Sequence, residues 1–125
     1  MRTKEEITDL ITEIDNLIGT VKNKEDLEYL GDIKATLQWV LKKILKEKET
    51  SKTEENLKEI SNKTDIDELS DDEFKASMDF MNKEFEGRFK GRDPYTVCNV
   101  DDALGWVLED ISTKQFLSDS FLKLK

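Results

Sequence analysis

Apolar residues recur at steps of three and four over the first 46 residues, and this periodicity constrains the fold most strongly. One stripe comprises Ile7, Leu10, Ile11, Ile14, Leu17, Ile18 and Val21. After a short polar connection, a second stripe comprises Leu27, Leu30, Ile33, Leu37, Val40, Leu41, Ile44 and Leu45. Such spacing predicts amphipathic α-helices. A short connection makes neighbouring helices antiparallel, so residues 3–46 are predicted to form a helical hairpin.

The remainder of the chain has the same character with weaker stripes. A third helix is predicted from Phe74, Met78, Met81, Phe85 and Phe89, and a fourth from Val100, Ala103, Leu104, Val107, Leu108 and Ile111. A short last helix is expected around Phe116, Leu117 and Phe121. Only one proline and five glycines interrupt the 125 residues, which favours helices over a turn-rich β fold.

Four residues have the character of helix N-caps; two of them, Thr3 and Ser70, are followed three positions later by glutamate, as in a capping box, and the other two by aspartate. They are Thr3, Asn23, Ser70 and Asn99. Together with the stripes, they predict an all-α fold of four to five helices, arranged as two antiparallel helical hairpins. The predicted units are residues 1–46, residues 70–125 and the segment 47–69 between them, for which an acidic linker and a short helix both stay open.

An internal similarity links the two predicted hairpins. Residues 37–44 and 104–111 share the pattern Leu-x-Trp-Val-Leu-x-x-Ile, and each contains one of the two tryptophans. Duplication of a hairpin is one interpretation. Reuse of common residues by two amphipathic helices is the other.

Charge is concentrated in the middle of the chain. The formal net charge is −9, and residues 49–72 contribute nine acids against three bases, a net of −6. A negative field disfavours nucleic-acid binding and permits docking on a basic protein surface. The acids expected to contact such a partner are Asp65, Asp67, Glu68, Asp71 and Asp72.

Aromatic residues supply a second set of candidate contacts. Trp39 and Trp106 fall near the edges of their stripes, where a tryptophan either covers the rim of the core or anchors a partner. Phe89 and Tyr95 lie in a segment that also contains Lys83, Arg88, Lys90 and Arg92. Aromatic and basic residues together can bind single-stranded nucleic acid, but four bases beside a net charge of −9 favour a turn that packs its aromatics inward.

The chain lacks the residues that most catalytic mechanisms need. Without histidine, Ser-His-Asp and Cys-His arrangements and histidine-ligated metal sites are excluded. Cys98 is the only cysteine, so neither a disulfide within the chain nor a zinc–cysteine cluster can form. We therefore expect no enzyme activity, no cofactor and no metal. No signal peptide or membrane span is expected, which favours the cytoplasm.

Two functions remain. The first is a small acidic protein that binds another protein as an inhibitor or adaptor, for example by placing carboxylates in the basic groove of a nucleic-acid enzyme. The second is a helical module for oligomerisation or assembly, because Leu30, Leu37 and Ile44 recur every seven residues. Under the second hypothesis, the chain forms a homodimer or larger oligomer.

The first hairpin resembles the small helical-hairpin proteins of phages and mobile elements. The resemblance covers residues 3–41, from Thr3-Lys4-Glu5-Glu6-Ile7 to Leu37-Gln38-Trp39-Val40-Leu41. It implies an origin among accessory phage genes, whose short acidic products include anti-CRISPR and other anti-defence inhibitors that act on host machinery. It supplies no functional residues, and it does not account for the acidic segment or the second half.

Overall fold

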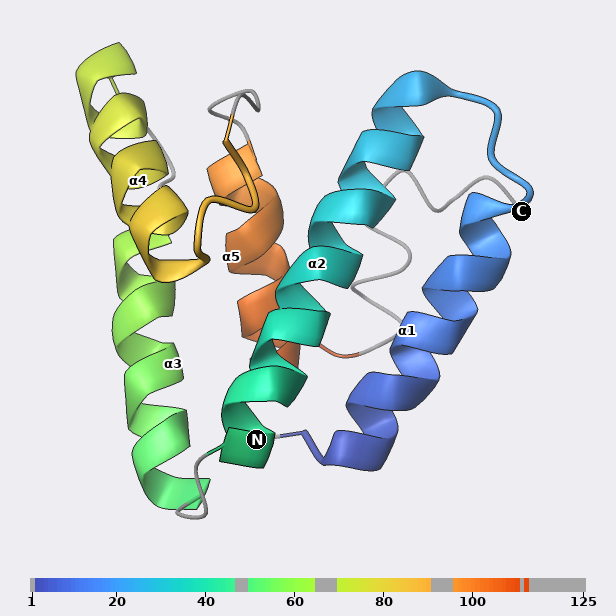
Figure 1. Cartoon of the computed structure of the whole chain (residues 1–125), viewed down its shortest axis with the longest axis horizontal. Coiled ribbons are helices and arrows are strands. Elements are labelled where there is room, and N and C mark those ends of the chain that lie inside the picture. Colours follow the sequence, from blue (N-terminus) through green and yellow to red (C-terminus); the bar gives the residue numbers. More distant parts are fainter. Residues whose placement is uncertain (1, 47–49, 65–69, 91–95, 111, 113–125) are drawn as a thin grey trace.

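A computed structural model describes residues 2–46, 50–64, 70–90, 96–110 and 112, which contain five α-helices and no strand (Figure 1). The helices are α1 (Lys4–Ile18), α2 (Lys24–Lys46), α3 (Thr50–Thr64), α4 (Asp71–Glu84) and α5 (Thr96–Val107). The predicted all-α class is confirmed. Helix α3 occupies most of the segment for which a linker and a short helix were both open. The last predicted helix, around Phe116, lies outside the described residues.

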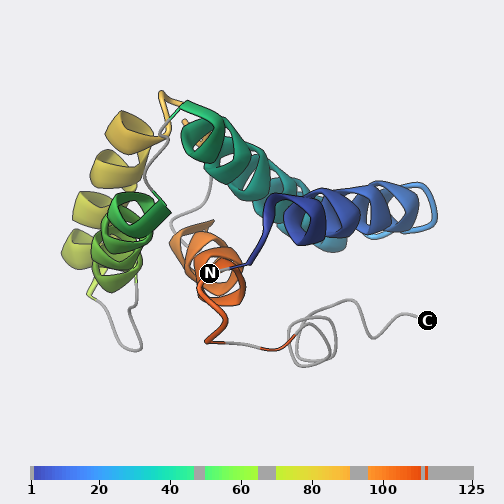
Figure 2. The ribbon, with the colours of Figure 1, turned by 90° about the horizontal axis from the view of Figure 1, so that it is seen from below.

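Helix α5 lies at the centre of the arrangement. It packs against α2, α3 and α4, whereas α1 packs against α2. Figure 2 shows α5 with α1 and α2 to one side of it and α3 and α4 to the other. Buried side chains from all five helices belong to one core cluster. Helix α5 therefore connects the first two helices of the chain with α3 and α4 through its packing.

Three of the four predicted caps start helices. In both the Thr3–Glu6 and the Ser70–Glu73 boxes, the hydroxyl and the carboxylate satisfy backbone N–H groups reciprocally. Asn23 starts α2 by accepting a hydrogen bond at Oδ1 from the backbone N–H of Glu25 (2.8 Å). The predicted cap at Asn99 is wrong, because α5 begins three residues earlier, at Thr96.

The buried face of α2 is rotated from the predicted stripe. Leu30, Ile33, Leu37 and Val40 are fully buried as predicted, but Leu27 is 36% exposed. The face that contains Asp32 is covered by α5, since Asn99 of α5 donates a hydrogen bond to the Asp32 carboxylate. The buried face accordingly extends to Tyr29, Asp32, Thr36 and Trp39. The stripe predicted from hydrophobicity alone could not include the polar members of this face.

Helix α4 is shorter than its apolar pattern predicted. It ends at Glu84, and Phe89 lies in the following turn. Glu86 (φ 56°) and Gly87 (φ 77°) adopt left-handed conformations, and the N–H of Gly87 donates to the carbonyl of Asn82 (2.6 Å). This is a Schellman ending, which turns the chain back across the last helical turn.

Candidate functional site

The structure describes only part of the predicted acidic surface. Asp71 and Asp72 lie in the first turn of α4 and are exposed. Carboxylates at a helix N-terminus are stabilised by the helix dipole, so these two acids also favour the helix that presents them. Asp65, Asp67 and Glu68 lie outside the described residues. The described part of the surface is therefore a pair of carboxylates at one end of α4.

Two of the predicted aromatic contacts belong to a buried cluster. The ring of Trp39 lies 4.3 Å from that of Phe85 between centroids, and Phe85 lies 5.4 Å from Phe89 in an edge-to-face arrangement. Trp39 is 7% exposed and Phe89 2%. These rings fasten the turn after α4 to α2, and we base no interface on them. Tyr95 lies outside the described residues.

Trp106 is also buried, beneath the N-terminal residues. The guanidinium of Arg2 lies 4.9 Å from the centroid of the Trp106 ring. Arg2 Nε donates a hydrogen bond to the carbonyl of Trp106 (3.1 Å), and the backbone N–H of Arg2 donates to the carbonyl of Val107 (2.8 Å). Arg2 thus satisfies the Val107 carbonyl at the end of α5, and it gives the Trp106 carbonyl a second donor beside the backbone N–H of Glu109 (3.0 Å). The arrangement gives Trp106 a structural role.

The structure describes three of the four basic residues around the turn after α4. Lys83, Arg88 and Lys90 are exposed, whereas the rings of Phe85 and Phe89 point into the core. The aromatics are therefore not stacked beside the cations on the surface, as binding of single-stranded bases would require. Arg92 lies outside the described residues.

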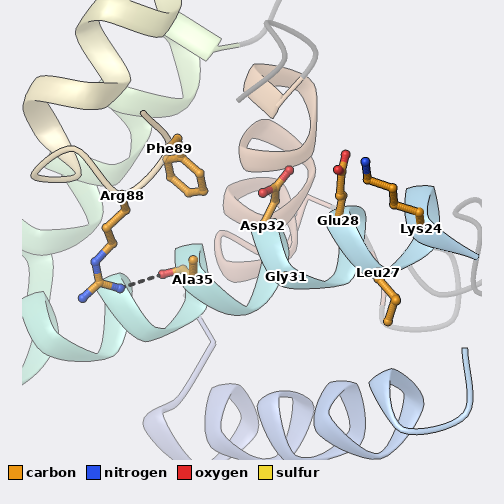
Figure 3. A pocket seen from close by; sticks show the side chains of 8 residues that line it. All are labelled: Lys24, Leu27, Glu28, Gly31, Asp32, Ala35, Arg88 and Phe89. Atoms are coloured by element: carbon orange, nitrogen blue, oxygen red, sulfur yellow. Dashed lines mark hydrogen bonds between the residues drawn. The ribbon is translucent and has the colours of Figure 1, made fainter. Parts of the chain in front are cut away.

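A shallow groove of about 400 Å³ runs along the outer face of α2 and ends at the turn after α4 (Figure 3). Its lining comprises Lys24, Leu27, Glu28, Gly31, Asp32, Ala35, Arg88 and Phe89. Arg88 Nη1 donates to the carbonyl of Ala35 (3.4 Å), which fixes one end of the groove. The sequence analysis missed this feature. Its one local signal is Gly31, a glycine in the interior of a long helix.

A hydrogen bond between the buried Asp32 and the half-buried Asn99 supports the inner wall of the groove. Asp32 is 4% exposed, and its Oδ2 accepts a hydrogen bond from Asn99 Nδ2 of α5 (3.0 Å). The hydroxyl of Thr36 donates to the backbone carbonyl of Asp32 (2.8 Å). Burial of a carboxylate is costly unless it is hydrogen-bonded, so the Asn99 amide stabilises this packing of α5 on α2. Asn99, which the sequence predicted to cap a helix, instead links α5 to α2 by this hydrogen bond.

The described residues offer little reactive chemistry. Cys98 is half-buried, and burial, followed by the nearby carboxylates of Asp102 and Asp101, raises the pKa of its thiol. The nucleophilic thiolate is therefore disfavoured at neutral pH. Within the described ranges, no three cysteine, aspartate or glutamate residues come together as a metal site would need. No helix in this part of the chain has the length and apolar character needed to cross a membrane.

Comparisons with protein-family models, with curated proteins and with solved structures found no match.

Proposed function

We propose that this protein binds another protein through its acidic surface, as a small inhibitor or adaptor. The observation that carries the proposal is the exposed pair Asp71 and Asp72 at the start of α4, at the end of a segment with a net charge of −6. Helix α4 packs against α5, so the pair stands on a helix of the common core. Carboxylates held in this way complement a basic surface at little cost in ordering.

The partner we propose is a host nucleic-acid enzyme with a basic groove. Five carboxylates within eight residues (65–72) can occupy positions that phosphates take in the natural complex. Together with the resemblance to phage hairpin proteins, this supports an anti-defence inhibitor, such as an anti-CRISPR protein, acting in the host cytoplasm. Enzyme activity, a cofactor and a metal have no part in the proposal.

Salt-dependent capture tests the proposal. The full chain, immobilised, is offered a panel of purified nucleases, polymerases and CRISPR effector complexes at about 0.05 M and about 0.5 M NaCl. Because screening shortens the range of charge interactions, we expect a partner that binds at low salt and loses affinity roughly tenfold or more at high salt.

The acidic surface is tested by two charge-matched variants. The first neutralises the acids of the surface: Asp65, Asp67, Glu68, Asp71 and Asp72, each changed to its amide. The second neutralises five exposed acids elsewhere: Glu5, Asp9, Glu25, Asp79 and Asp110. Both lose five negative charges, but we expect only the first to lose binding. Equal binding by both variants, or capture that high salt leaves unchanged, would contradict the proposal.

The alternative, an assembly module built on the seven-residue recurrence, has less support. Leu30 and Leu37 have no exposed surface and pack within the core of the chain itself. A coiled-coil seam needs these side chains on the outside, where a partner helix can cover them.

A further inference from the structure

Gly31 has no role within the described part of the chain that requires glycine. It lies in the interior of α2, where glycine is among the least favourable residues. A Cβ built at this position meets no atom within 4 Å, and the residue is exposed. The space beside Gly31 is therefore open to an approaching molecule.

Leu27 and Ala35 lie four residues before and four residues after Gly31 on the same groove (Figure 3). Among the side chains whose burial the structure describes, Leu27 is the one large hydrophobic that is exposed, at 36%. Ala35 is small and half-buried. One end of the helix face thus carries an exposed leucine, and the other end carries only the methyl group of an alanine.

We propose that this groove binds a second copy of the chain. In a two-fold dimer, a residue that contacts a second position is itself contacted by that position in the partner. If two α2 helices cross in antiparallel orientation at Gly31, Leu27 of each copy lies over Ala35 of the other. Both residues are about 6 Å from the crossing point along the helix axis, because each residue adds 1.5 Å. The missing side chain at Gly31 allows close approach of the two backbones.

The charges of the groove fit the same symmetry. Glu28 lies three residues before Gly31, so the two-fold axis places Glu28 of the second copy beside positions 34 and 35. Arg88 lies at this end of the groove, donating to the carbonyl of Ala35. The dimer therefore brings Arg88 of each copy next to Glu28 of the other, and the pair forms twice.

This surface differs from the acidic one that carries the proposed function. The groove lies on α2 and on the turn that follows α4, whereas Asp71 and Asp72 lie at the opposite end of α4. Because the groove is small and both charged groups are exposed, we expect a weak, reversible dimer, with a Kd on the order of 100 µM.

Sedimentation equilibrium of the full chain, from about 10 µM to about 1 mM, tests the dimer across that Kd. We expect wild type to pass from monomer to dimer in this range. Gly31→Leu places a bulky side chain where the two helices approach each other, and because its Cβ meets no atom within 4 Å in the single chain, we expect it to fold and its Kd to rise roughly tenfold or more. Thr12→Leu adds the same apolar side chain at an exposed position of α1 and should dimerise like wild type. A wild type that stays monomeric, or an equal Kd for Gly31→Leu, would overturn the proposal.

Charge reversal tests the pairing directly. Glu28→Arg and Arg88→Glu should each be monomeric alone, because each places like charges at both contacts. Mixed in equal amounts, the two variants should dimerise, since both Arg–Glu contacts are restored with reversed partners. The double variant should dimerise by itself for the same reason. If neither the mixture nor the double variant regains the wild-type Kd, the proposed contact is wrong. Circular dichroism checks that each variant keeps its helices.

Discussion

The two tryptophan segments have the same sequence pattern and different surroundings. Residues 37–41 and 104–108 share Leu-x-Trp-Val-Leu, and both tryptophans are buried. Trp39 lies against Phe85 from the turn after α4, whereas Trp106 lies against Arg2 from the start of the chain. A common local pattern therefore buries the ring in each case, but residues far away in the sequence determine what covers it.

The two helices also end differently. Helix α2 continues past its tryptophan segment to Lys46, but α5 stops at Val107. Glu109 adopts a left-handed conformation (φ 66°), and the N–H of Asp110 donates to the carbonyl of Gly105 (2.9 Å), which is again a Schellman ending. The shared pattern thus specifies which face of the helix is buried, whereas the residues that follow the pattern determine where the helix ends.

Removing either ring should have the largest effect. We expect Trp39→Ala and Trp106→Ala each to lower the free energy of unfolding by about 3–5 kcal/mol, because both leave a large cavity in the core. Chemical denaturation followed by circular dichroism measures the loss, and Gln38→Ala, at an exposed position of α2, is the control. A loss below about 1 kcal/mol for one ring would show that its surroundings collapse around the cavity.

Arg2 should distinguish the two segments. Arg2→Ala removes the hydrogen bond to the Trp106 carbonyl and the cation–π contact, and we expect it to cost about 1–2 kcal/mol of unfolding free energy. The exposed neighbour Lys4, changed to alanine, should cost little.

A double-mutant cycle isolates the ring contact. Arg2→Ala should cost less in a Trp106→Ala background than in wild type, and it should keep its full cost in a Trp39→Ala background. Equal costs in all three backgrounds would contradict a specific contact between Arg2 and Trp106.

The ending of α5 offers a stabilising change. Glu109→Gly should raise the free energy of unfolding by about 0.5–1 kcal/mol, because glycine adopts the left-handed conformation without the steric cost of a side chain. The adjacent Asp110→Gly should lower it, since that residue does not have a positive φ. Thermal denaturation measures both, and a lower melting temperature for Glu109→Gly would contradict the assigned ending.

The smallest effect concerns the charge of Glu6. Hydrogen bonding to the backbone of Thr3, and then to Arg2, lowers the pKa of Glu6 below its ordinary value. A depressed folded pKa means that this stabilisation is present above the unfolded pKa and is lost as the pH falls through the folded one. Carboxyl NMR titration should show the Glu6 pKa rising in Arg2→Ala and unchanged in Lys4→Ala.

Much of the secondary structure followed from local signals. The stripe of α1 and the two capping boxes are formed as predicted, because both depend on neighbours within one or two turns. The buried face of α2 could not be predicted from local signals. Leu27 is exposed and Asp32 is buried, the reverse of what their hydrophobicity predicts. That reversal depends on where α5 packs, and α5 is more than fifty residues away in the sequence.

The candidate contacts were less predictable than the fold. Edge spacing of Trp39 and Trp106 was compatible with exposure, and only the approach of Phe85 and Arg2 buries the rings. The groove was invisible to periodicity because it combines one face of α2 with Arg88 from a later turn. Sequence spacing shows which side chains share a helix face, but not which distant segment covers it.

The central place of α5 has a consequence during synthesis. Arg2 and Trp106 are 104 residues apart in the chain, and α2 is complete about sixty residues before α5 ends. At about 5–20 residues per second, the ribosome needs roughly 3–12 s to make that interval. Throughout it, the side of α2 that receives α5 faces water or a chaperone. The nascent chain therefore carries an apolar surface that the finished protein conceals.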